Sequence, residues 1–579
     1  MAVLGVHDGH DNGAGLAGNG TVLGAINEER FTKLKNDVGF PVNSIRYMIK
    51  AAGDAEIDRI AVARIDGAAI FTRLFPVLDV QRRRLFRHEI PKPSAMNLHI
   101  SNMIFKLTQE QRPKWLWSRL GKGISSYTIG ARLRKLGLGS KIVFVEHHLA
   151  HASSAYYASG FNEALVITLD ASGDGICGSV SIGDKGELTR IKEFRAGASL
   201  GILYGAATVA CDMRFSEDEG KLMSLAAYSF PSEIKGLKEF SYYDESRKEL
   251  VSSSGIKYEF LLAEHMRNTM LWRHSREAFA YSVQKYAEQQ VLKMVRQYIR
   301  ETNIHNVAVA GGLFSNIIIN MLINELPEVN RFFVFPHVGD GGLALGAAYY
   351  ADFKENGKFN GRQVDNIYFG PEYSDSYIED VLARHRKVKR IDYEEVSDIA
   401  SYTADKMVDE NEVILWFQGR MEYGPRALGN RSVLAMPNVA ESRDRINFMI
   451  KKRPYYQPFA STMLEEDAKS MLDPCIGKNR FMTVGYKVKE ERRKDLVAAS
   501  HIDGTTRPQM LGEENAMFRK LIKKVRKESG IGALLNTSLN KHGRPIVMDP
   551  EDAIWTLLNT GATSLSIGNF FVHKRKKSA

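Results

Sequence analysis

Two histidines spaced four residues apart give the clearest chemical signal in this sequence. His147 and His151 lie in a run that continues with helix-compatible residues. On a helix, this spacing places both imidazoles on one face, as a pair of metal ligands requires. Two histidines are half a site, and Asp340, in a glycine-rich loop before a helix-like run, is a suitable third ligand. The alternative is that both histidines are structural side chains satisfied within the core.

Loops that follow apolar strands supply further polar groups. An apolar strand at residues 3–6 leads into Asp8-Gly9-His10-Asp11, and a hairpin follows at residues 13–26. The same order recurs at residues 164–191, where the strand ends at Asp170. Two copies of strand, Asp/Gly loop and hairpin predict an internally duplicated α/β domain. The arrangement suits an actin-like ATPase fold, whose hairpin loops clamp phosphates, although two unrelated hairpins would contain the same turns.

A pair of glycines after another buried strand predicts a nucleotide cradle. Residues 307–310 are apolar and lead into Gly311-Gly312, and a helix begins near Asn316. Glycines let a ligand approach the backbone, and the N-terminus of a helix favours anions. Because Gly-Gly turns are common, the prediction depends on the position of this turn between a strand and a helix.

The composition changes near residues 352–361, which are polar and rich in turn formers. We therefore expect one domain over residues 1–355 and a second α/β domain over residues 356–579. In the second, a strand at residues 413–417 leads into a loop with Arg420, Arg426 and Arg431, whose guanidinium groups can fork onto phosphate or carboxylate oxygens. Other basic and polar groups occur at residues 451–453, 501–509 and 536–540. Each could lie on a solvated face, but together they predict an anion site.

The composition is that of a globular protein in a reducing compartment. Of 579 residues, 44% are hydrophobic and 25% are charged, and the three cysteines lie far apart. The N-terminus lacks the pattern of a signal peptide, and no apolar run approaches the roughly 18 residues of a membrane span. We therefore expect a cytoplasmic protein.

Residues 73–141, called the basic insert below, carry the whole excess of positive charge. The chain has a net charge of +11, and this segment holds fifteen Lys and Arg against three acids, 15 − 3 = +12. Because the rest is near neutral, nucleic-acid binding by the whole protein is not expected. Residues 82–87 and 114–119 mix cations with aromatic rings, which suits a peripheral membrane contact or an acidic acceptor. The alternative is a helical insertion that covers the first domain or forms a homodimer contact.

Taken together, these motifs resemble the O-carbamoyltransferases of the nodulation-factor, cephamycin, novobiocin and tobramycin type. The resemblance runs nearly from end to end, and the long arginine motif at residues 424–432 is part of it. The other motifs, in order along the chain, are residues 8–11, 27–32, 147–152, 220–223, 311–316, 339–342, 453–460, 503–509 and 535–540.

The resemblance implies an α/β fold in which a duplicated actin-like, ribonuclease-H-like ATPase domain is followed by a YrdC-like α/β domain. The first is similar to the tRNA threonylcarbamoyltransferase. In such proteins, carbamoyl phosphate and ATP give carbamoyl-adenylate at the second domain. The first domain then transfers the carbamoyl group to an acceptor hydroxyl, here of a sugar, a natural product or a lipid-linked saccharide. The implied cofactors are ATP and one divalent metal, Fe²⁺ or Zn²⁺, with Mg²⁺ accompanying ATP.

The resemblance also implies roles for individual residues. The metal would be held by His147, His151 and Asp340, and either Asp8 or His10 would take the proton from the acceptor hydroxyl; Asp8 could instead form a turn. Phosphate charge would be neutralised by Arg426, Arg431, Lys452, Arg453 and Arg507. Hydrogen bonds would come from Ser432, Asn536, Thr537 and Ser538. The expected nucleotide contacts in the first domain are Asp11, Asp170, Lys221, Gly311, Gly312 and Asn316.

Two other functions fit parts of the sequence. One is a tRNA-modifying carbamoyl or threonylcarbamoyl transferase that uses the basic insert to bind RNA. The other is a non-enzymatic actin-like ATPase scaffold, which the arginine motif argues against because a scaffold needs no additional anion site. ATP–pyrophosphate exchange that depends on carbamoyl phosphate separates these classes.

Overall fold

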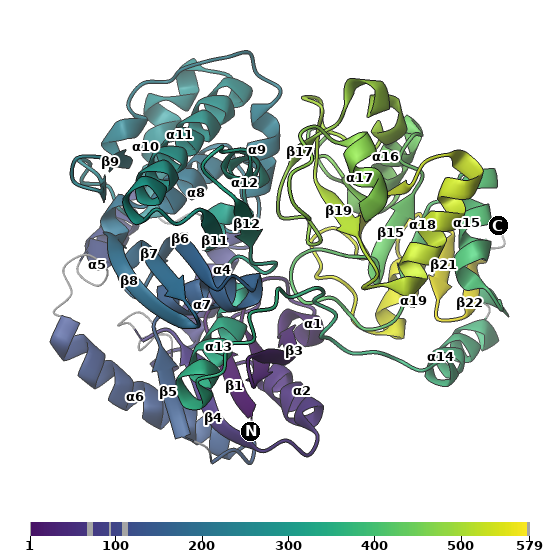
Figure 1. Ribbon diagram of the computed structural model, residues 1–579, viewed down its shortest axis with the longest axis horizontal. Helices are drawn as coiled ribbons and strands as arrows, with labels where there is room; N and C mark the ends of the chain where they lie inside the picture. Colours follow the sequence, from purple (N-terminus) through teal and green to yellow (C-terminus); the bar gives the residue numbers. More distant parts are fainter. Residues whose placement is uncertain are drawn as a thin grey trace. The chain divides into compact units, whose positions relative to one another are not determined.

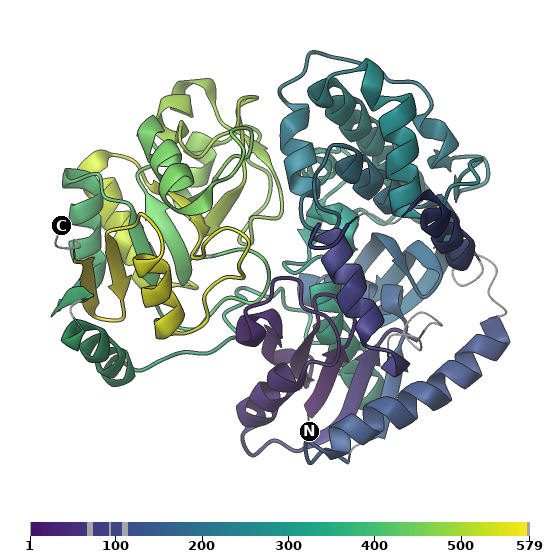
Figure 2. The same cartoon turned by 180° about the vertical axis from the view of Figure 1, so that it is seen from behind.

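The chain folds into two compact units (Figures 1 and 2). The computed structural model describes residues 2–65, 73–91, 94–106, 114–139, 141–388 and 390–575, without the side chains of residues 79 and 114–122. The first unit comprises residues 1–29 and 36–364, and the second comprises residues 30–35 and 365–579. The first unit extends past the expected boundary at residue 355 because the Val364 amide still donates to the Ala158 carbonyl, at 2.9 Å.

The first unit contains two five-stranded sheets with the same topology. The first has the order β3-β2-β1-β4-β5 and the second has the order β8-β7-β6-β11-β12. In each, the first three strands in sequence pair antiparallel, and the last two continue the sheet in parallel. This repeated order confirms the predicted duplicated actin-like domain. The strands are β1 (Ala2–His7), β2 (Gly13–Gly18), β3 (Thr21–Asn27), β4 (Ile57–Ala63), β5 (Lys141–Val145), β6 (Glu163–Gly173), β7 (Ile176–Asp184), β8 (Glu187–Arg195), β11 (Asn306–Ala310) and β12 (Arg331–Val334).

Two helices, α7 (His147–Ser159) and α13 (Leu343–Asn356), pack together between these sheets (Figure 1). Helix α13 covers β1, and α7 covers β6 and β11. The helices approach closely at Gly346, where a Cβ atom would lie 2.0 Å from the carbonyl oxygen of Ala150. This close packing fixes the start of α7 against the start of α13, the two ends from which the candidate site is built.

The remaining helices of the first unit flank this double-sheet core. Helix α2 packs on β2 and β3, and a helical layer that includes α8, α9, α10 and α11 follows the second hairpin. The basic insert forms α4, α5 and α6. The bounds are α1 (Glu29–Thr32), α2 (Val42–Ala52), α4 (Val77–Phe86), α5 (Ala95–Phe105), α6 (Lys114–Arg134), α8 (Leu200–Ala210), α9 (Glu219–Ala226), α10 (Glu259–Thr269), α11 (Arg276–Thr302) and α12 (Ile317–Asn324).

The second unit is an α/β domain around an eight-stranded mixed sheet of order β13-β22-β21-β14-β15-β20-β16-β19. One face packs on α15 and α18, and the other packs on α14, α16 and α19, so the central strands are buried on both sides. Its likeness to the YrdC fold stays a prediction. The elements include β13 (Ile391–Glu395), β14 (Ile414–Phe417), β15 (Arg431–Ala435), β16 (Ala460–Leu464), β19 (Pro508–Leu511), β20 (Ala533–Ser538), β21 (Ser564–Ile567), β22 (Phe570–Lys574), α14 (Asp375–Lys387), α15 (Ile399–Asp409), α16 (Ala440–Ile446), α17 (Glu465–Met471), α18 (Ala516–Ser529) and α19 (Pro550–Leu558).

Within the described ranges, no helix is both long enough and apolar enough to cross a bilayer. The longest helix of the basic insert, α6, contains several cations.

Candidate functional site

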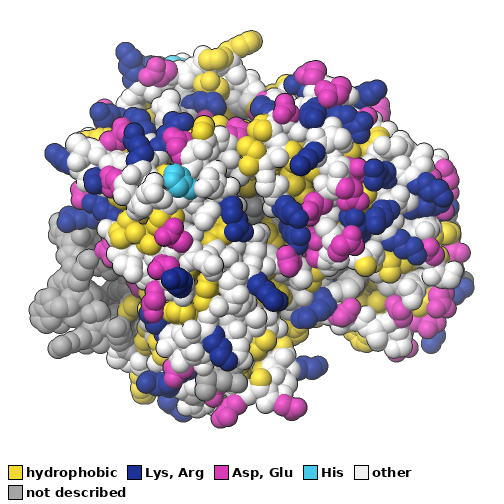
Figure 3. Space-filling model, viewed as in Figure 1, with side chains coloured by type: hydrophobic (Ala, Val, Ile, Leu, Met, Phe, Trp, Pro, Cys, Tyr) yellow, Lys and Arg dark blue, Asp and Glu magenta, His cyan; other side chains and the backbone are white. Residues whose placement is uncertain are grey.

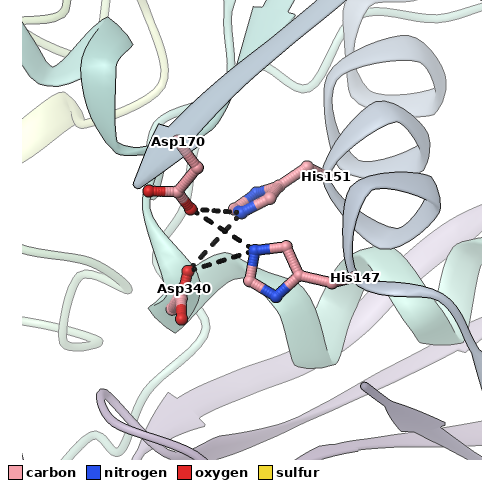
Figure 4. A group of neighbouring side chains, drawn as sticks. All are labelled: His147, His151, Asp170 and Asp340. Atoms are coloured by element: carbon pink, nitrogen blue, oxygen red, sulfur yellow. Dashed lines mark hydrogen bonds and ion pairs between the residues drawn. The ribbon is translucent and has the colours of Figure 1, made fainter. Parts of the chain in front are cut away.

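Four side chains from three segments of the first unit meet at one point (Figure 4). His147 and His151 come from α7, Asp170 comes from β6, and Asp340 comes from the turn before α13. The Nε2 atoms of the two histidines lie 3.4 and 3.1 Å from Oδ2 of Asp170, and 3.6 and 3.5 Å from Oδ1 of Asp340. Two imidazole nitrogens and two carboxylate oxygens form a candidate metal centre.

The spacing of these four atoms fits a metal ion. Ligand atoms about 2.1 Å from one ion lie about 3.0 Å apart in octahedral geometry and about 3.4 Å apart in tetrahedral geometry. The four nitrogen–oxygen distances, 3.1 to 3.6 Å, fall around these values. Asp170, expected to contact nucleotide, lies with the candidate metal ligands instead. Asp170 follows the regularly paired part of β6, and its approach to the histidines depends on the packing of α7 on that strand.

Local structure explains why the two histidines point the same way. Helix α7 begins at His147. The Glu146 carboxylate caps it by accepting hydrogen bonds from the backbone amides of His148 and Leu149. The His147 amide donates to Asp174, at 2.8 Å. The intervening His148 points elsewhere, toward the Thr168 hydroxyl and the Ile176 carbonyl, at 2.9 and 3.2 Å. The i, i+4 spacing therefore selects two ligands and leaves the middle histidine structural.

The carboxylates already stabilise positive charge at this point. Burial lowers the pKa of His151, but hydrogen bonds to Asp170 and Asp340 outweigh burial and raise that pKa to about 9. Burial and the neighbouring Asp340 raise the pKa of Asp170, but hydrogen bonds from His147 and His151 outweigh them and lower it to about 2. A divalent cation would satisfy both carboxylates in place of these protons.

Asp8, one of the two candidate bases, is held in a buried ion pair. Its carboxylate takes two bonds from Arg73, at 2.8 and 2.9 Å, and both side chains are buried. Burial raises the pKa of Asp8, but the charge of Arg73 outweighs burial and lowers it to about 2. Arg73 also donates to the Ser125 hydroxyl of α6, at 2.6 Å, so the basic insert is tied to the loop after β1. No sequence pattern marks Arg73.

His10, the other candidate base, faces the metal centre. Its Nε2 lies 3.2 Å from Oδ2 of Asp340, and its Nδ1 lies 3.6 Å from Asp11. Burial lowers the pKa of His10, but the charges of Asp340 and Asp11 raise it to about 9. The side chain remains 37% exposed. His10 therefore combines access to solvent with contact to a candidate metal ligand.

The strand, the paired glycines and the helix start on which the nucleotide-cradle prediction rests are present, but the side chains of Asn316 and Lys221, also expected to contact nucleotide, have other partners. Gly311 has φ of +103°, and a Cβ atom there would lie 2.3 Å from the Leu169 carbonyl oxygen. The Asn316 carboxamide caps α12 and donates to Gln284, at 2.8 Å. Lys221 forms an ion pair with Asp218, at 2.7 Å. Glycine is thus required at position 311, where β11 ends close to β6. The Asn316 side chain caps α12 and is not available to line a cradle.

Three half-buried arginines of the second unit form a cluster with unbalanced positive charge. Burial and the charges of Arg426 and Arg453 hold the pKa of Arg507 well below its ordinary value. Burial and Arg426 lower the pKa of Arg453 to about 10. Within the described part of the chain, no acid compensates the three. Because guanidinium groups stay protonated in proteins, this cluster is a candidate site for a phosphate or carboxylate anion.

Arg431, predicted to contact phosphate, has a structural role instead. Its guanidinium group is fully buried, donates to the carbonyls of Gln418 and Pro371 among others, and lies 3.6 Å from the centre of the Phe417 ring. Its backbone amide donates to Glu422, at 3.0 Å. These contacts hold the arginine loop in shape, so the predicted direct contact with phosphate does not fit.

Lys452 is exposed and ends the preceding helical turn with φ of +47°, so the structure does not place it with the arginine cluster. The buried lysine is its neighbour Lys451, which donates to the carbonyls of Ser538 and Asn540. Burial and the charges of Arg453 and Lys35 hold the pKa of Lys451 well below its ordinary value. Adjacent lysines cannot be told apart by sequence when the helix geometry around them is irregular.

The polar cluster at the end of β20 lies beside the arginines. The Thr537 hydroxyl accepts from Arg453, at 3.4 Å, and the Ser538 hydroxyl contacts Asn540, at 2.9 Å. Asn536 is buried and donates to the Thr462 hydroxyl, at 2.9 Å. Ser432 is also buried, and its hydroxyl accepts from the Gly429 amide, at 3.2 Å. Thr537 is thus the member of this set that contacts the cluster, and Ser432 serves the loop.

Two family models match this chain. The model described as the carbamoyltransferase N-terminus matches residues 2–349, and the model described as the carbamoyltransferase C-terminus matches residues 405–574. The first match alone covers more than half of the chain. The order of the two matches follows the order of the two units.

Named relatives agree with these models. Nodulation protein NolNO of Sinorhizobium fredii is 32% identical over 585 residues, which cover 98% of this chain and 80% of that protein. The 3'-hydroxymethylcephem-O-carbamoyltransferase of Amycolatopsis lactamdurans is 28% identical over 369 residues, which cover 61% of this chain and 64% of that protein. Among solved structures, HypF of T. kodakarensis matches 62% of this chain and 48% of its own, at 15% identity and a TM-score of 0.33. That score is too low to support an argument, so the fold assignment rests on strand order. The family models and the long relatives confirm the resemblance, and the chain belongs to the carbamoyltransferase family, whose chemistry is the enzymatic transfer of a carbamoyl group.

Proposed function

We propose that this enzyme is an ATP-dependent O-carbamoyltransferase that works in two steps. In the first, water cleaves carbamoyl phosphate to carbamate and inorganic phosphate, and the carbamate oxygen then attacks the α-phosphorus of ATP, which gives carbamoyl-adenylate and releases pyrophosphate. In the second, an acceptor hydroxyl attacks the carbamoyl carbon and AMP leaves. The observation that carries this proposal is that one chain has both a metal-ligand cluster and an unbalanced arginine cluster.

The arginine cluster suits the first step. Carbamoyl phosphate and the triphosphate of ATP are strongly anionic, and three guanidinium groups without acidic partners provide fixed positive charge. The hydroxyl of Thr537, beside Arg453, adds a neutral hydrogen bond. Arg431 contributes by holding the loop that carries Arg426, so its effect is on geometry.

The metal-ligand cluster suits the second step. His147, His151, Asp170 and Asp340 would hold one divalent ion, and such an ion acts as a Lewis acid on a phosphate oxygen. Two imidazoles and two carboxylates are compatible with Zn²⁺ or Fe²⁺. The two histidines are buried, so their orientation is fixed by α7 before any ligand binds.

His10 is the better candidate for the base that takes the proton from the acceptor hydroxyl. It is partly exposed and contacts Asp340, whereas the Asp8 carboxylate has both oxygens bonded to buried Arg73. When a cation offsets the charge of Asp340, the pKa of His10 falls and the imidazole becomes neutral, and the neutral ring can accept the proton of the acceptor hydroxyl. The acceptor belongs to the class of hydroxyl-bearing molecules, as the printed name of the cephem relative indicates for that protein.

Two substitutions test this division of labour. His151→Ala should abolish carbamoyl transfer but leave most of the ATP–pyrophosphate exchange that depends on carbamoyl phosphate. Arg507→Met should lower the exchange itself by roughly 10²–10³-fold, the usual effect of removing one preorganised charge contact. Both activities are measured on the full chain, the exchange with labelled pyrophosphate and the transfer with a sugar hydroxyl as acceptor.

Arg443→Met is the matched control, because Arg443 is partly exposed and paired with its neighbour Asp444 at 3.0 Å. It removes the same charge and should leave exchange unchanged. If Arg507→Met lost only transfer, the assignment of adenylate formation to the arginine cluster would be wrong. Exchange without added carbamoyl phosphate would contradict the proposed first step.

A further inference from the structure

Helix α5 of the basic insert turns an apolar stripe toward solvent. Met96, Ile100, Met103 and Ile104 are 72%, 40%, 55% and 51% exposed. Their spacing of three to four residues places them on one side of the helix. Ordinary surface helices bury such a stripe against the core, so this one is oriented the other way.

The opposite side of α5 explains why the stripe cannot simply rotate inward. Leu98 and Asn102 are buried, and the Asn102 side chain accepts from the backbone amides of Lys257 and Tyr258, at 2.7 and 2.9 Å. Its amide group donates to the Gly255 carbonyl, at 3.2 Å. These bonds fix α5 against α10 at the side of the first unit (Figure 1), so the apolar stripe is held outward.

Exposed apolar side chains continue along the same insert. Among the described residues, 23 large hydrophobic side chains are exposed, and ten of them lie between residues 74 and 127. Single exposed apolar residues are normal on protein surfaces, but a concentration of this kind marks an interaction surface. Besides those of α5, the exposed residues are Leu74, Phe75, Val77, Leu78, Val80 and Tyr127.

The charge of this segment indicates what the surface meets. Residues 90–109, which contain α5, include Lys92 and Lys106 and no Asp or Glu. The whole insert has fifteen cations against three acids, and one of these cations, Arg73, is buried in its ion pair with Asp8. By contrast, basic and acidic side chains are interspersed over much of the face drawn in Figure 3. The partner should therefore be apolar at its centre and anionic at its surface.

We propose that the basic insert docks this enzyme on the surface of an anionic lipid bilayer. An interfacial helix needs an apolar stripe that enters the acyl boundary and cations that stay among the headgroups; α5 has the stripe, and α4 of the same insert carries the exposed cations Arg82 and Arg84. Nucleic acid fits less well, because aliphatic side chains such as Met96, Ile100 and Met103 offer neither stacking nor hydrogen bonds to bases. The proposal goes beyond the transfer reaction and does not depend on its mechanism.

Vesicle cosedimentation with the full-length protein tests this proposal. The wild type should bind vesicles of phosphatidylcholine with one third phosphatidylglycerol at low salt. Binding should fall strongly with phosphatidylcholine alone, and also in about 1 M salt, where the Debye length is about 3 Å. The variant Met96→Gln, Ile100→Gln, Met103→Gln should reduce partitioning by roughly tenfold or more, because three apolar side chains no longer enter the bilayer.

A matched control replaces three exposed hydrophobic residues elsewhere, Phe230→Gln, Trp272→Gln and Ile502→Gln, and should bind as the wild type does. Circular dichroism of both triple variants checks that the fold is kept. Failure of the wild type to bind anionic vesicles at low salt would overturn the proposal, as would equal binding by the α5 variant. If the α5 variant instead converted a dimer to a monomer in sedimentation, the stripe would contact a second copy and the lipid proposal would be wrong.

Discussion

Asp8 and Arg73 form an ion pair with almost no exposed surface at the end of β1. Each charge is acceptable there only because the other is present, since an isolated charge loses its hydration on burial. The pair also joins two parts of the first unit, because Arg73 belongs to the basic insert and also contacts Ser125 of α6. Replacing one partner therefore has a larger effect than replacing both.

We expect Asp8→Asn to lower the free energy of unfolding by about 3–5 kcal/mol near neutral pH, because Arg73 loses its counter-charge. The pKa of Asp8 is lowered from 3.8 to about 2 by folding. Its pH-dependent contribution is therefore complete above pH 3.8 and is lost as pH falls through 2. The difference in the free energy of unfolding between wild type and variant should therefore shrink by roughly 2 kcal/mol as the pH falls over that range. Urea unfolding at a series of pH values measures it.

The double variant Asp8→Asn with Arg73→Met is the control. It leaves no unpaired buried charge and should recover part of the loss. If the double variant were as unstable as the sum of both single variants, the two side chains would be acting independently. A difference that stayed constant down to pH 2 would show that the Asp8 carboxylate is not the group responsible.

Residue type alone predicted which side chains carry charge, but not whether that charge faces a ligand. Arg426 and Arg507 have no acidic partner in the described chain, whereas Arg431, in the same loop motif, is surrounded by backbone carbonyls. Lys451 and Lys452 differ in the same way. The difference depends on which direction a loop turns, and that is set by packing of distant strands.

At the scale of elements, the repeated patterns in the sequence were sufficient to predict the secondary structure around the candidate metal centre. The repeated strand, loop and hairpin predicted the two sheets, and the i, i+4 histidines predicted a helix whose one face presents both. Neither pattern could show that Asp170 joins Asp340, because this requires α7 and α13 to pack between two sheets far apart in sequence. Long-range packing supplied the part of the site that local patterns lack.

Gly173, at the end of β6, offers a test of how this packing controls the metal centre. A Cβ atom at this position would lie 2.2 Å from the ring of His147. We expect Gly173→Ala to displace that imidazole and lower metal affinity by roughly 10–100-fold, as changes that misorient a ligand do. Metal content after dialysis against a chelator, together with isothermal titration with Zn²⁺, measures the effect.

Gly139→Ala is the control, since nothing lies within 4 Å of a Cβ atom there. It should bind metal as the wild type does. Unchanged affinity in Gly173→Ala would mean that His147 is not a ligand. A variant that lost its secondary structure would be compared at lower temperature, where affinity and folding can be separated by circular dichroism.

At the scale of the whole molecule, the two units do not follow each other simply along the chain. Residues 30–35 leave the first unit and become part of the second. Arg30 is buried and donates to the Gly424 carbonyl, at 2.7 Å, and Lys33 forms ion pairs with Asp549 and Asp552. The family models, which divide the chain into an N-terminal and a C-terminal match, do not reveal this exchange.

We expect Arg30→Met, made in the full chain, to destabilise the second unit selectively. Loss of a buried hydrogen bond from a charged group costs about 1–3 kcal/mol. Hydrogen exchange followed by mass spectrometry should show faster exchange around Gly424 and in β14 and β15, with β1 to β5 unchanged. Equal acceleration in both units would contradict the assignment of this segment to the second unit.

The same excursion has a consequence for the order in which the protein is made. Residues 30–35 leave the ribosome long before Gly424, Asp549 and Asp552 are synthesised. At translation rates of about 5–20 residues per second, Lys33 waits about 25–100 s for its two acidic partners. During that interval the first unit can close its own sheets while this short basic segment stays accessible to chaperones and proteases. The first unit can therefore fold before the second, but residues 30–35 reach their final position only after the second unit has been synthesised.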